Sequence, residues 1–275
     1  MTKSIWAVGA SVAVMVFTTH VDANTRSTTS NTYETSRTAD AELVAQAGAP
    51  LFDGMGDYHR AITTSSEDAQ RYFDQGMVLA FGFNHAEAIR SFRAAQRLDP
   101  QCAMCFWGEA LATGPNINVT AKGKAVMSPE ERQSAFAAIN KAMALRSSSS
   151  PAEQQLIEAQ AERYNGNSET PRDPLDQAYA DAMGRYVAAY PEDDDAAAIY
   201  AESLMNLMPW DYWSDPETPK EDTRKVIAAL ERIIERSPDH PLALHLYIHA
   251  VEASDNPAIA EDEADRLLGL VPGSG

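Results

Sequence analysis

Residues 69–100 read AQRYFDQGMVLAFGFNHAEAIRSFRAAQRLDP and contain the pattern that decides the fold. Apolar side chains recur there every three or four positions, which is the spacing of one face of an α-helix. Gly76, Ala88 and Ala95 are small enough to let two helices approach closely, and Pro100 ends the second helix. The stretch therefore predicts two antiparallel helices. Such a pair cannot bury its own faces, so neighbouring pairs must stack on it.

Helix starts of one type recur along the rest of the chain. A Ser, Thr, Asp or Asn precedes a Pro, which is tolerated at the first helical position because the missing N–H would have no partner there. An acid two residues after the Pro is typical of a capping box. The starts are Asp99-Pro100, Ser128-Pro129, Ser150-Pro151, Asp173-Pro174, Thr218-Pro219 and Asn256-Pro257. Because no alternating strand pattern lies between them, we predict an all-α protein of about ten helices.

The first helix pair resembles a tetratricopeptide repeat. The spacing of that 34-residue repeat is met by Tyr72, Gly76, Leu79, Ala88, Phe92, Ala95 and Pro100. More degenerate repeats follow, with insertions at 114–127 and 208–215. The resemblance implies a right-handed α-solenoid of about five tetratricopeptide-like helix pairs over residues 65–275. The motifs NHAEA (84–88), CAMCFWG (102–108) and GPNIN (114–118) are similar to those of exported bacterial members of unassigned activity, which implies a truncated array or one capped by a partner.

The chain begins with features of an exported protein. A short basic start, an apolar run to Thr19 and small residues at Val21 and Ala23 predict a signal peptide over residues 1–23. The run is shorter than the roughly 20 residues of a membrane-spanning helix, so an uncleaved anchor is the weaker alternative. Polar residues 24–48 predict a flexible linker, and 49–64 a strap without secondary structure over the first helix. We expect a bacterial periplasmic or secreted protein, with no integral membrane domain once the signal is cleaved.

The charge balance limits the partners. The 22 Lys and Arg residues face 40 Asp and Glu, which gives a net charge of −18. Such a field repels nucleic acid and anionic lipid, and no basic stripe interrupts it. We expect no nucleic-acid partner.

The resemblance also implies where a partner would bind, because the first helices of these repeats line a concave groove. The positions that map to it are Phe73, Met77, Phe81, Met104, Trp107, Leu111, Glu202, Met205, Asn206, His245, His249 and Glu252. Methionine and aromatic side chains would give adaptable contacts to a peptide, and the polar positions would fix its orientation. The alternative is that Phe73, Trp107 and Leu111 are packed under neighbouring loops.

His245, His249 and Glu252 lie along one helix face and could hold zinc or copper. A further ligand would come from His85, from Glu202 or from sequence beyond this chain. Leu246 follows His245, so the general base of an HExxH metalloprotease is missing. The alternative is that both imidazoles hydrogen-bond across the groove or to a neighbouring helix.

Cys102 and Cys105 are one helical turn apart. In an exported protein such a pair forms a local disulfide or stays as two buried apolar groups, with metal binding as a third alternative. Phe106 follows Cys105 in place of the His that covalent haem attachment needs, which excludes a c-type cytochrome on this motif.

No catalytic constellation is complete in the sequence, so we expect a non-enzymatic exported scaffold without a cofactor that binds a peptide or protein in its groove. The alternative is a metal-binding protein or metalloenzyme that uses His245 and His249. The apolar stripe of Leu267, Leu268, Leu270 and Val271 near the chain end also predicts self-association through the fifth repeat.

Overall fold

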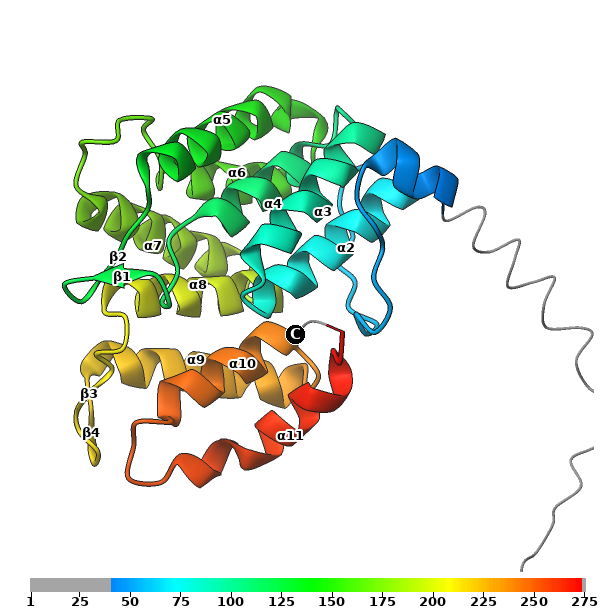
Figure 1. The fold of residues 1–275 in the computed structure, drawn as a ribbon. Coiled ribbons are helices and arrows are strands. Elements are labelled where there is room, and N and C mark those ends of the chain that lie inside the picture. Colours follow the sequence, from blue (N-terminus) through cyan, green and yellow to red (C-terminus); the bar gives the residue numbers. More distant parts are fainter. Residues whose placement is uncertain (1–40, 274–275) are drawn as a thin grey trace, which may run out of the picture. The chain divides into compact units, whose positions relative to one another are not determined.

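The computed structural model describes residues 41–273, which are mainly helical (Figure 1). The helices are α2 (Glu67–Phe81), α3 (His85–Leu98), α4 (Ala103–Thr113), α5 (Pro129–Leu145), α6 (Pro151–Ala161), α7 (Arg172–Ala189), α8 (Asp194–Leu207), α9 (Glu221–Arg236), α10 (Pro241–Val251) and α11 (Glu261–Leu270), with short 3-10 helices at Arg146–Ser148 and Pro257–Ala260. The predicted all-α class is confirmed. The predicted signal peptide lies outside the described residues.

Two short antiparallel hairpins interrupt the helices where the sequence carries its two insertions. In the first, β1 (Thr120–Ala121) pairs with β2 (Lys124–Ala125) between α4 and α5. In the second, β3 (Trp213–Asp215) pairs with β4 (Thr218–Pro219) between α8 and α9. Each hairpin lies between the two helices of one predicted pair, α4 and α5 or α8 and α9.

The predicted caps account for some helix starts and not for others. Ser128 and Ser150 each form a complete capping box, so α5 and α6 begin at the predicted prolines. The predictions at Pro100 and Pro219 are wrong: α4 begins at Ala103, and Pro219 pairs in a hairpin before α9. Asp99 instead accepts hydrogen bonds from Thr64 and Ser65, which ties this turn to the segment before α2.

Small residues allow the first three helices to pack closely, as the sequence pattern predicts. Phe92 of α3 is completely buried beside Gly76 of α2 and Gly108 of α4. A Cβ atom on Gly76 would lie 2.7 Å from the Phe92 ring, and one on Gly108 would lie closer still. Helices α2, α3 and α4 therefore share one tightly packed core around Phe92.

Each helix from α2 to α11 packs against the next one in the sequence (Figure 1). Alternate helices also meet, since α4 contacts both α2 and α6, and α10 contacts α8. In addition, α10 contacts α2 although more than 150 residues separate them, and a hydrogen bond joins His245 to the Phe81 carbonyl. The first and fifth predicted pairs are therefore direct neighbours.

The segment before α2 is bound to the helices by its backbone. Residues 49–64 contain no helix or strand, and Gln75 and Gln70 of α2 accept hydrogen bonds from the Phe52 and Ile62 N–H groups. The linker prediction needs a correction at its C-terminal end, because residues 42–47 are helical and Ala47 is completely buried. Ala47 belongs to the hydrophobic core, and its carbonyl accepts a hydrogen bond from Arg97. Residues 24–40 lie outside the described part of the chain.

None of the helices in residues 41–273 combines the length and the apolar character that crossing a bilayer requires.

Candidate functional site

The apolar positions of the predicted groove belong to the hydrophobic core. At most 3% of the surface is exposed for Phe73, Met77, Phe81, Met104, Trp107, Met205 and Asn206, and Leu111 and Glu202 are half-buried. Phe73 packs against Phe92 with ring centroids 5.5 Å apart, and Phe81 packs against Tyr58 of the strap at 5.3 Å. The contact between α2 and α10 also covers part of the predicted groove. These side chains pack inside the domain. The alternative interpretation placed Phe73, Trp107 and Leu111 under neighbouring loops, whereas Phe73 packs on Phe92 of α3.

The polar end of the predicted groove forms a pair of facing imidazoles. His245 and His249 lie one turn apart on α10, and their Nε2 atoms are 3.0 Å apart. Both side chains are half-buried. Burial lowers the pKa of His245, and its hydrogen bond to the Phe81 carbonyl partly offsets this shift. The structure therefore brings together the two histidines that the sequence singled out.

The remaining nitrogen of each ring has an acceptor of its own. His245 Nδ1 lies 2.6 Å from the Phe81 carbonyl oxygen, and His249 Nδ1 lies 2.9 Å from Glu252 Oε1. A carbonyl or a carboxylate oxygen can only accept, so each Nδ1 carries the hydrogen and donates it. The Nε2 atoms are then the nitrogens whose lone pairs are available between the two rings.

Glu252 occupies a different position from the one predicted. It was expected as a third metal ligand beside the two histidines, but its carboxylate contacts the Nδ1 side of His249, away from the facing Nε2 atoms. The side chain lies three residues after His249 and reaches that ring first. Within residues 41–273, no group of three or more His, Cys, Asp or Glu side chains is placed to hold a metal ion.

Two aromatic residues enclose the imidazole pair. The Phe83 ring lies 4.5 Å from His245 and is parallel to His249 at 6.1 Å, while Trp210 meets His249 edge-on at 5.3 Å. Phe83 has φ 59° and Trp210 φ 61°, a region that residues other than glycine rarely adopt. At Phe83 this conformation belongs to a Schellman motif at the end of α2, in which the N–H groups of Phe83 and Asn84 donate to the Ala80 and Leu79 carbonyls. Only Lys122 shares this conformation among the described non-glycine residues.

His85 adds a third imidazole to this region. Both of its ring nitrogens are buried without a hydrogen-bond partner, and its ring stacks on Phe83 at 5.6 Å. Burial, together with the charges of Arg163 and His245, lowers the pKa of His85 to about 4. His85 is therefore neutral at physiological pH.

A buried polar region continues from His85 between the helices. Arg163 lies 3.4 Å from Asp176, donates to the Pro115 carbonyl and covers the face of Tyr179. Burial raises the pKa of Glu202, although the charge of Arg163 works against this shift. Glu202, which was predicted to lie in the groove, is half-buried beside this region, where the charge of Arg163 acts on it.

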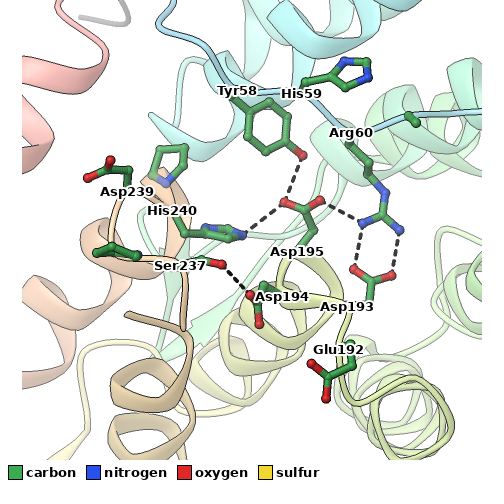
Figure 2. Close-up of a pocket in the computed structure, with 13 residues that line it drawn as sticks. Tyr58, His59, Arg60, Glu192, Asp193, Asp194, Asp195, Ser237, Asp239 and His240 are labelled. Carbon is green, nitrogen blue, oxygen red and sulfur yellow. Dashed lines mark hydrogen bonds and ion pairs between the residues drawn. The ribbon is translucent and has the colours of Figure 1, made fainter. Parts of the chain in front are cut away.

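A separate pocket of about 600 Å³ lies between the strap and the starts of α8 and α10 (Figure 2). Arg60 bridges Asp193 and Asp195, at 2.7 and 2.8 Å, and Tyr58 donates to Asp195. His240 Nε2 lies 3.1 Å from Asp195. Burial disfavours the charged carboxylate, but hydrogen bonding from His240 and the charge of Arg60 lower the pKa of Asp195 to about 2. The charges of this cluster are paired with one another. Arg60 connects the strap to the start of α8 through Asp193 and Asp195, and His240 connects the start of α10 to Asp195.

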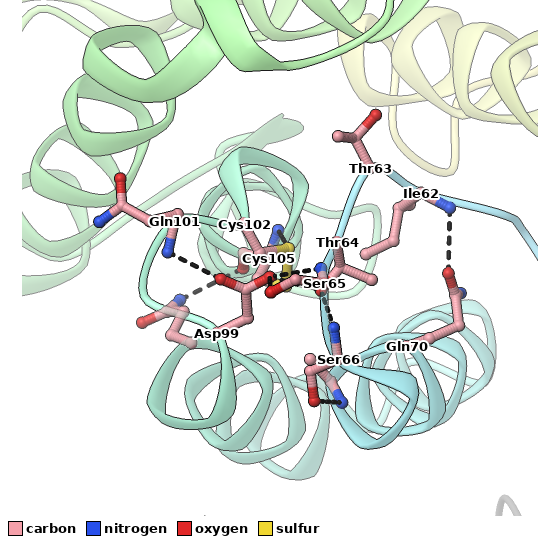
Figure 3. The surroundings of a disulfide bond; sticks show 12 residues. Ile62, Thr63, Thr64, Ser65, Ser66, Gln70, Asp99, Gln101, Cys102 and Cys105 are labelled. Carbon is pink, nitrogen blue, oxygen red and sulfur yellow. Dashed lines mark hydrogen bonds between the residues drawn. A yellow bond between two sulfur atoms is a disulfide. The ribbon is translucent and has the colours of Figure 1, made fainter.

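Cys102 and Cys105 form a disulfide at the start of α4 (Figure 3). Both residues are at most 1% exposed, and Cys102 also accepts the hydrogen bond of the Cys105 N–H as the helix cap. Of the alternatives for this pair, the structure therefore contains the local disulfide, which leaves no thiolate to bind a metal. Asp99 and Ser65 lie beside it and connect this turn to the strap.

Neither Phe83 nor Trp210 was among the predicted site residues, although the aromatic insertion that contains Trp210 was a candidate lid over the groove. Their backbone conformation and their contacts with α10 depend on tertiary structure, and neither belongs to a motif. The only local signal is their position, since Phe83 lies between α2 and α3 and Trp210 lies in the second insertion.

No protein-family model matches the sequence, and neither a curated protein nor a solved structure matches it significantly.

Proposed function

We propose that this protein is a tetratricopeptide-like repeat protein, exported from a bacterial cell, that acts by binding a protein or peptide partner. The observation that carries the proposal is the succession of helix pairs, in which each helix packs on the next and alternate helices touch. Arrays of this kind present extended surfaces for recognition. The spacing of Tyr72, Gly76 and Phe92 supports the same family.

The surface that fits a partner differs from the groove expected from the sequence. An apolar pocket of about 370 Å³ lies between the end of α2, α10 and α11, and is lined by Val78, Phe81, Gly82, Pro241, His245, Ile248, Ala264, Leu267, Leu268, Val271 and Pro272. Leu268 is 77% exposed at its edge. An exposed apolar groove between helices suits the apolar face of an amphipathic helix.

The surrounding charge indicates the type of partner. The first turn of α11 carries Glu261, Asp262 and Glu263, and the chain has a net charge of −18. A partner helix with basic residues beside its apolar face would be attracted to this surface, and an acidic one would be repelled. We therefore propose an amphipathic, basic peptide segment as the occupant of the pocket between α2, α10 and α11.

A displayed library of 15-residue peptides tests this function, with the purified chain as bait. We expect selected peptides to share apolar residues at i, i+3 or i+4 together with Lys or Arg. In fluorescence anisotropy, Leu268→Glu should weaken binding of a selected peptide about tenfold or more, because it places a charge at the edge of the pocket.

Val119→Glu is the matched control, since Val119 is 50% exposed beside the first hairpin and lies outside the pocket. It should leave peptide affinity unchanged. Selection of no common peptide pattern, or equal losses in both variants, would contradict the proposal. Light scattering tests whether a second copy of the chain occupies the pocket in place of a peptide. A dimer that dissociates in the Leu268→Glu variant would mean that it does.

A further inference from the structure

We propose that His245 and His249 bind one divalent transition-metal ion, of the zinc or copper class, through their facing Nε2 atoms. This site adjoins the proposed peptide pocket, which His245 also lines, and the peptide function itself requires no metal. Imidazole nitrogen is a preferred ligand of both ions. The proposal rests on the geometry of the pair, on the groups behind each ring and on the two aromatic residues beside it.

The separation of the two nitrogens suits a shared ion. Zinc binds imidazole at about 2.0–2.1 Å in tetrahedral geometry, which places two ligand nitrogens about 3.3 Å apart. The Nε2 atoms are 3.0 Å apart, so small side-chain rotations would admit the ion. Both histidines are on the same helix one turn apart, and the backbone of α10 therefore holds this separation.

The hydrogen bonds behind the rings are those that histidine ligands of metals make. Such a ligand almost always donates its other N–H to a carboxylate or a backbone carbonyl, which fixes the tautomer and orients the ring. His249 has a carboxylate partner in Glu252, and His245 has a carbonyl partner in Phe81. Two lone pairs that face each other at this distance repel each other, and a divalent ion between them would remove that repulsion.

The local electrostatics favour a cation at this point. Phe81 is the last residue of α2, so its carbonyl lies at the negative end of that helix dipole. Glu252 adds a carboxylate on the other side of the pair. The nearest rings, Phe83 and Trp210, form apolar walls around the histidines.

Phe83 and Trp210 give a further observation. Both rings contact the histidine pair, and they come from the turn after α2 and from the loop after α8. Since the described residues group no third His, Cys, Asp or Glu with the pair, the remaining coordination positions are left to water or to a group of a bound partner.

Isothermal titration of the full chain, purified without a histidine tag, with zinc alone and with copper alone tests the site. We expect one ion per chain at about 0.15 M salt, which screens unspecific attraction to the acidic surface. His249→Ala removes one ligand but keeps the His245 hydrogen bond to Phe81, and should weaken zinc binding about 100-fold or more. Glu252→Ala should weaken it about 10- to 100-fold, because it removes an orienting partner of a ligand.

His59→Ala is the matched control, since this exposed imidazole pairs with Asp74 and lies outside α10. It should bind zinc as the wild type does. Imidazole nitrogen NMR gives a second readout that does not depend on stability: zinc should shift the Nε2 signals of His245 and His249 together. The proposal is overturned if the wild type binds zinc no more tightly than the His245→Ala, His249→Ala double variant, if His59→Ala loses as much affinity, or if zinc leaves both Nε2 signals unchanged.

Discussion

His245 of α10 donates a hydrogen bond from Nδ1 to the carbonyl oxygen of Phe81, the last residue of α2, across a distance of 2.6 Å. The carbonyl groups in the last turn of a helix have no partner within that helix, so this bond satisfies one of them. It also connects the first predicted helix pair to the fifth. The same contact orients one ring of the imidazole pair.

Loss of this bond should destabilise the metal-free protein. In the presence of EDTA, we expect His245→Ala to lower the free energy of unfolding by about 1–3 kcal/mol, because the Phe81 carbonyl loses its partner in a largely buried position. Urea unfolding monitored by circular dichroism measures the change. His249→Ala, which leaves that bond in place, should cost less. Equal losses in the two variants would argue against a special role of the Phe81 contact.

The close approach of Gly108 to Phe92 gives a second prediction. Gly108→Ala should lower the free energy of unfolding by about 1–3 kcal/mol, because the added Cβ collides with a buried ring that cannot move away freely. Phe92→Leu in the same chain should reduce that additional cost. Gly269→Ala is the control with the opposite expected sign. Nothing lies within 4 Å of its Cβ position in α11, so this substitution should raise the free energy of unfolding by about 0.5–1 kcal/mol.

The helices could be predicted from the sequence because their signals are local. The apolar period of residues 69–100, and the capping boxes at Ser128 and Ser150, act within a few residues of the structure that they form. Other contacts replace the predicted helix starts at Pro100 and Pro219: Asp99 bonds Thr64 and Ser65, and Pro219 pairs with Trp213 in a hairpin. Local capping patterns do not contain that information.

The candidate site was predictable only where it follows helical spacing. His245 and His249 could be paired from the sequence since residues one turn apart share a face. The burial of Phe73 and Trp107 could not be predicted from the sequence, because it depends on which side of each helix meets its neighbours. The Phe81 carbonyl, Phe83 and Trp210 reach the pair from distant segments, so no spacing rule indicates them.

The ion-pair cluster around Asp195 should make stability depend on pH. The pKa of this carboxyl is lowered to about 2, below the roughly 3.9 of an unfolded aspartate. Its charged form therefore contributes stability that is complete above about pH 4 and is lost as the pH falls towards 2. We expect Asp195→Asn to cost about 2 kcal/mol at pH 7 and clearly less at pH 3.

Urea unfolding of the wild type and of Asp195→Asn at both pH values measures this difference. Asp239→Asn is the control, because Asp239 lines the same pocket but is largely exposed, with only a 4.0 Å approach to Arg266. A cost of Asp195→Asn that does not change between pH 7 and pH 3 would show that the charge of this carboxyl does not stabilise the fold.

The three described non-glycine residues with positive φ should differ in how substitution changes stability, because only Phe83 and Trp210 contact the imidazole pair. Lys122 is exposed and forms the two-residue loop between β1 and β2 with Gly123, both at positive φ. Such loops favour Asn-Gly, so Lys122→Asn should raise the free energy of unfolding by up to about 1 kcal/mol. Phe83→Asn relieves the same backbone strain but removes a ring that packs on three histidines. We expect it to lower stability in urea unfolding, and a gain in both variants would show that the Phe83 ring contributes little to holding the histidines.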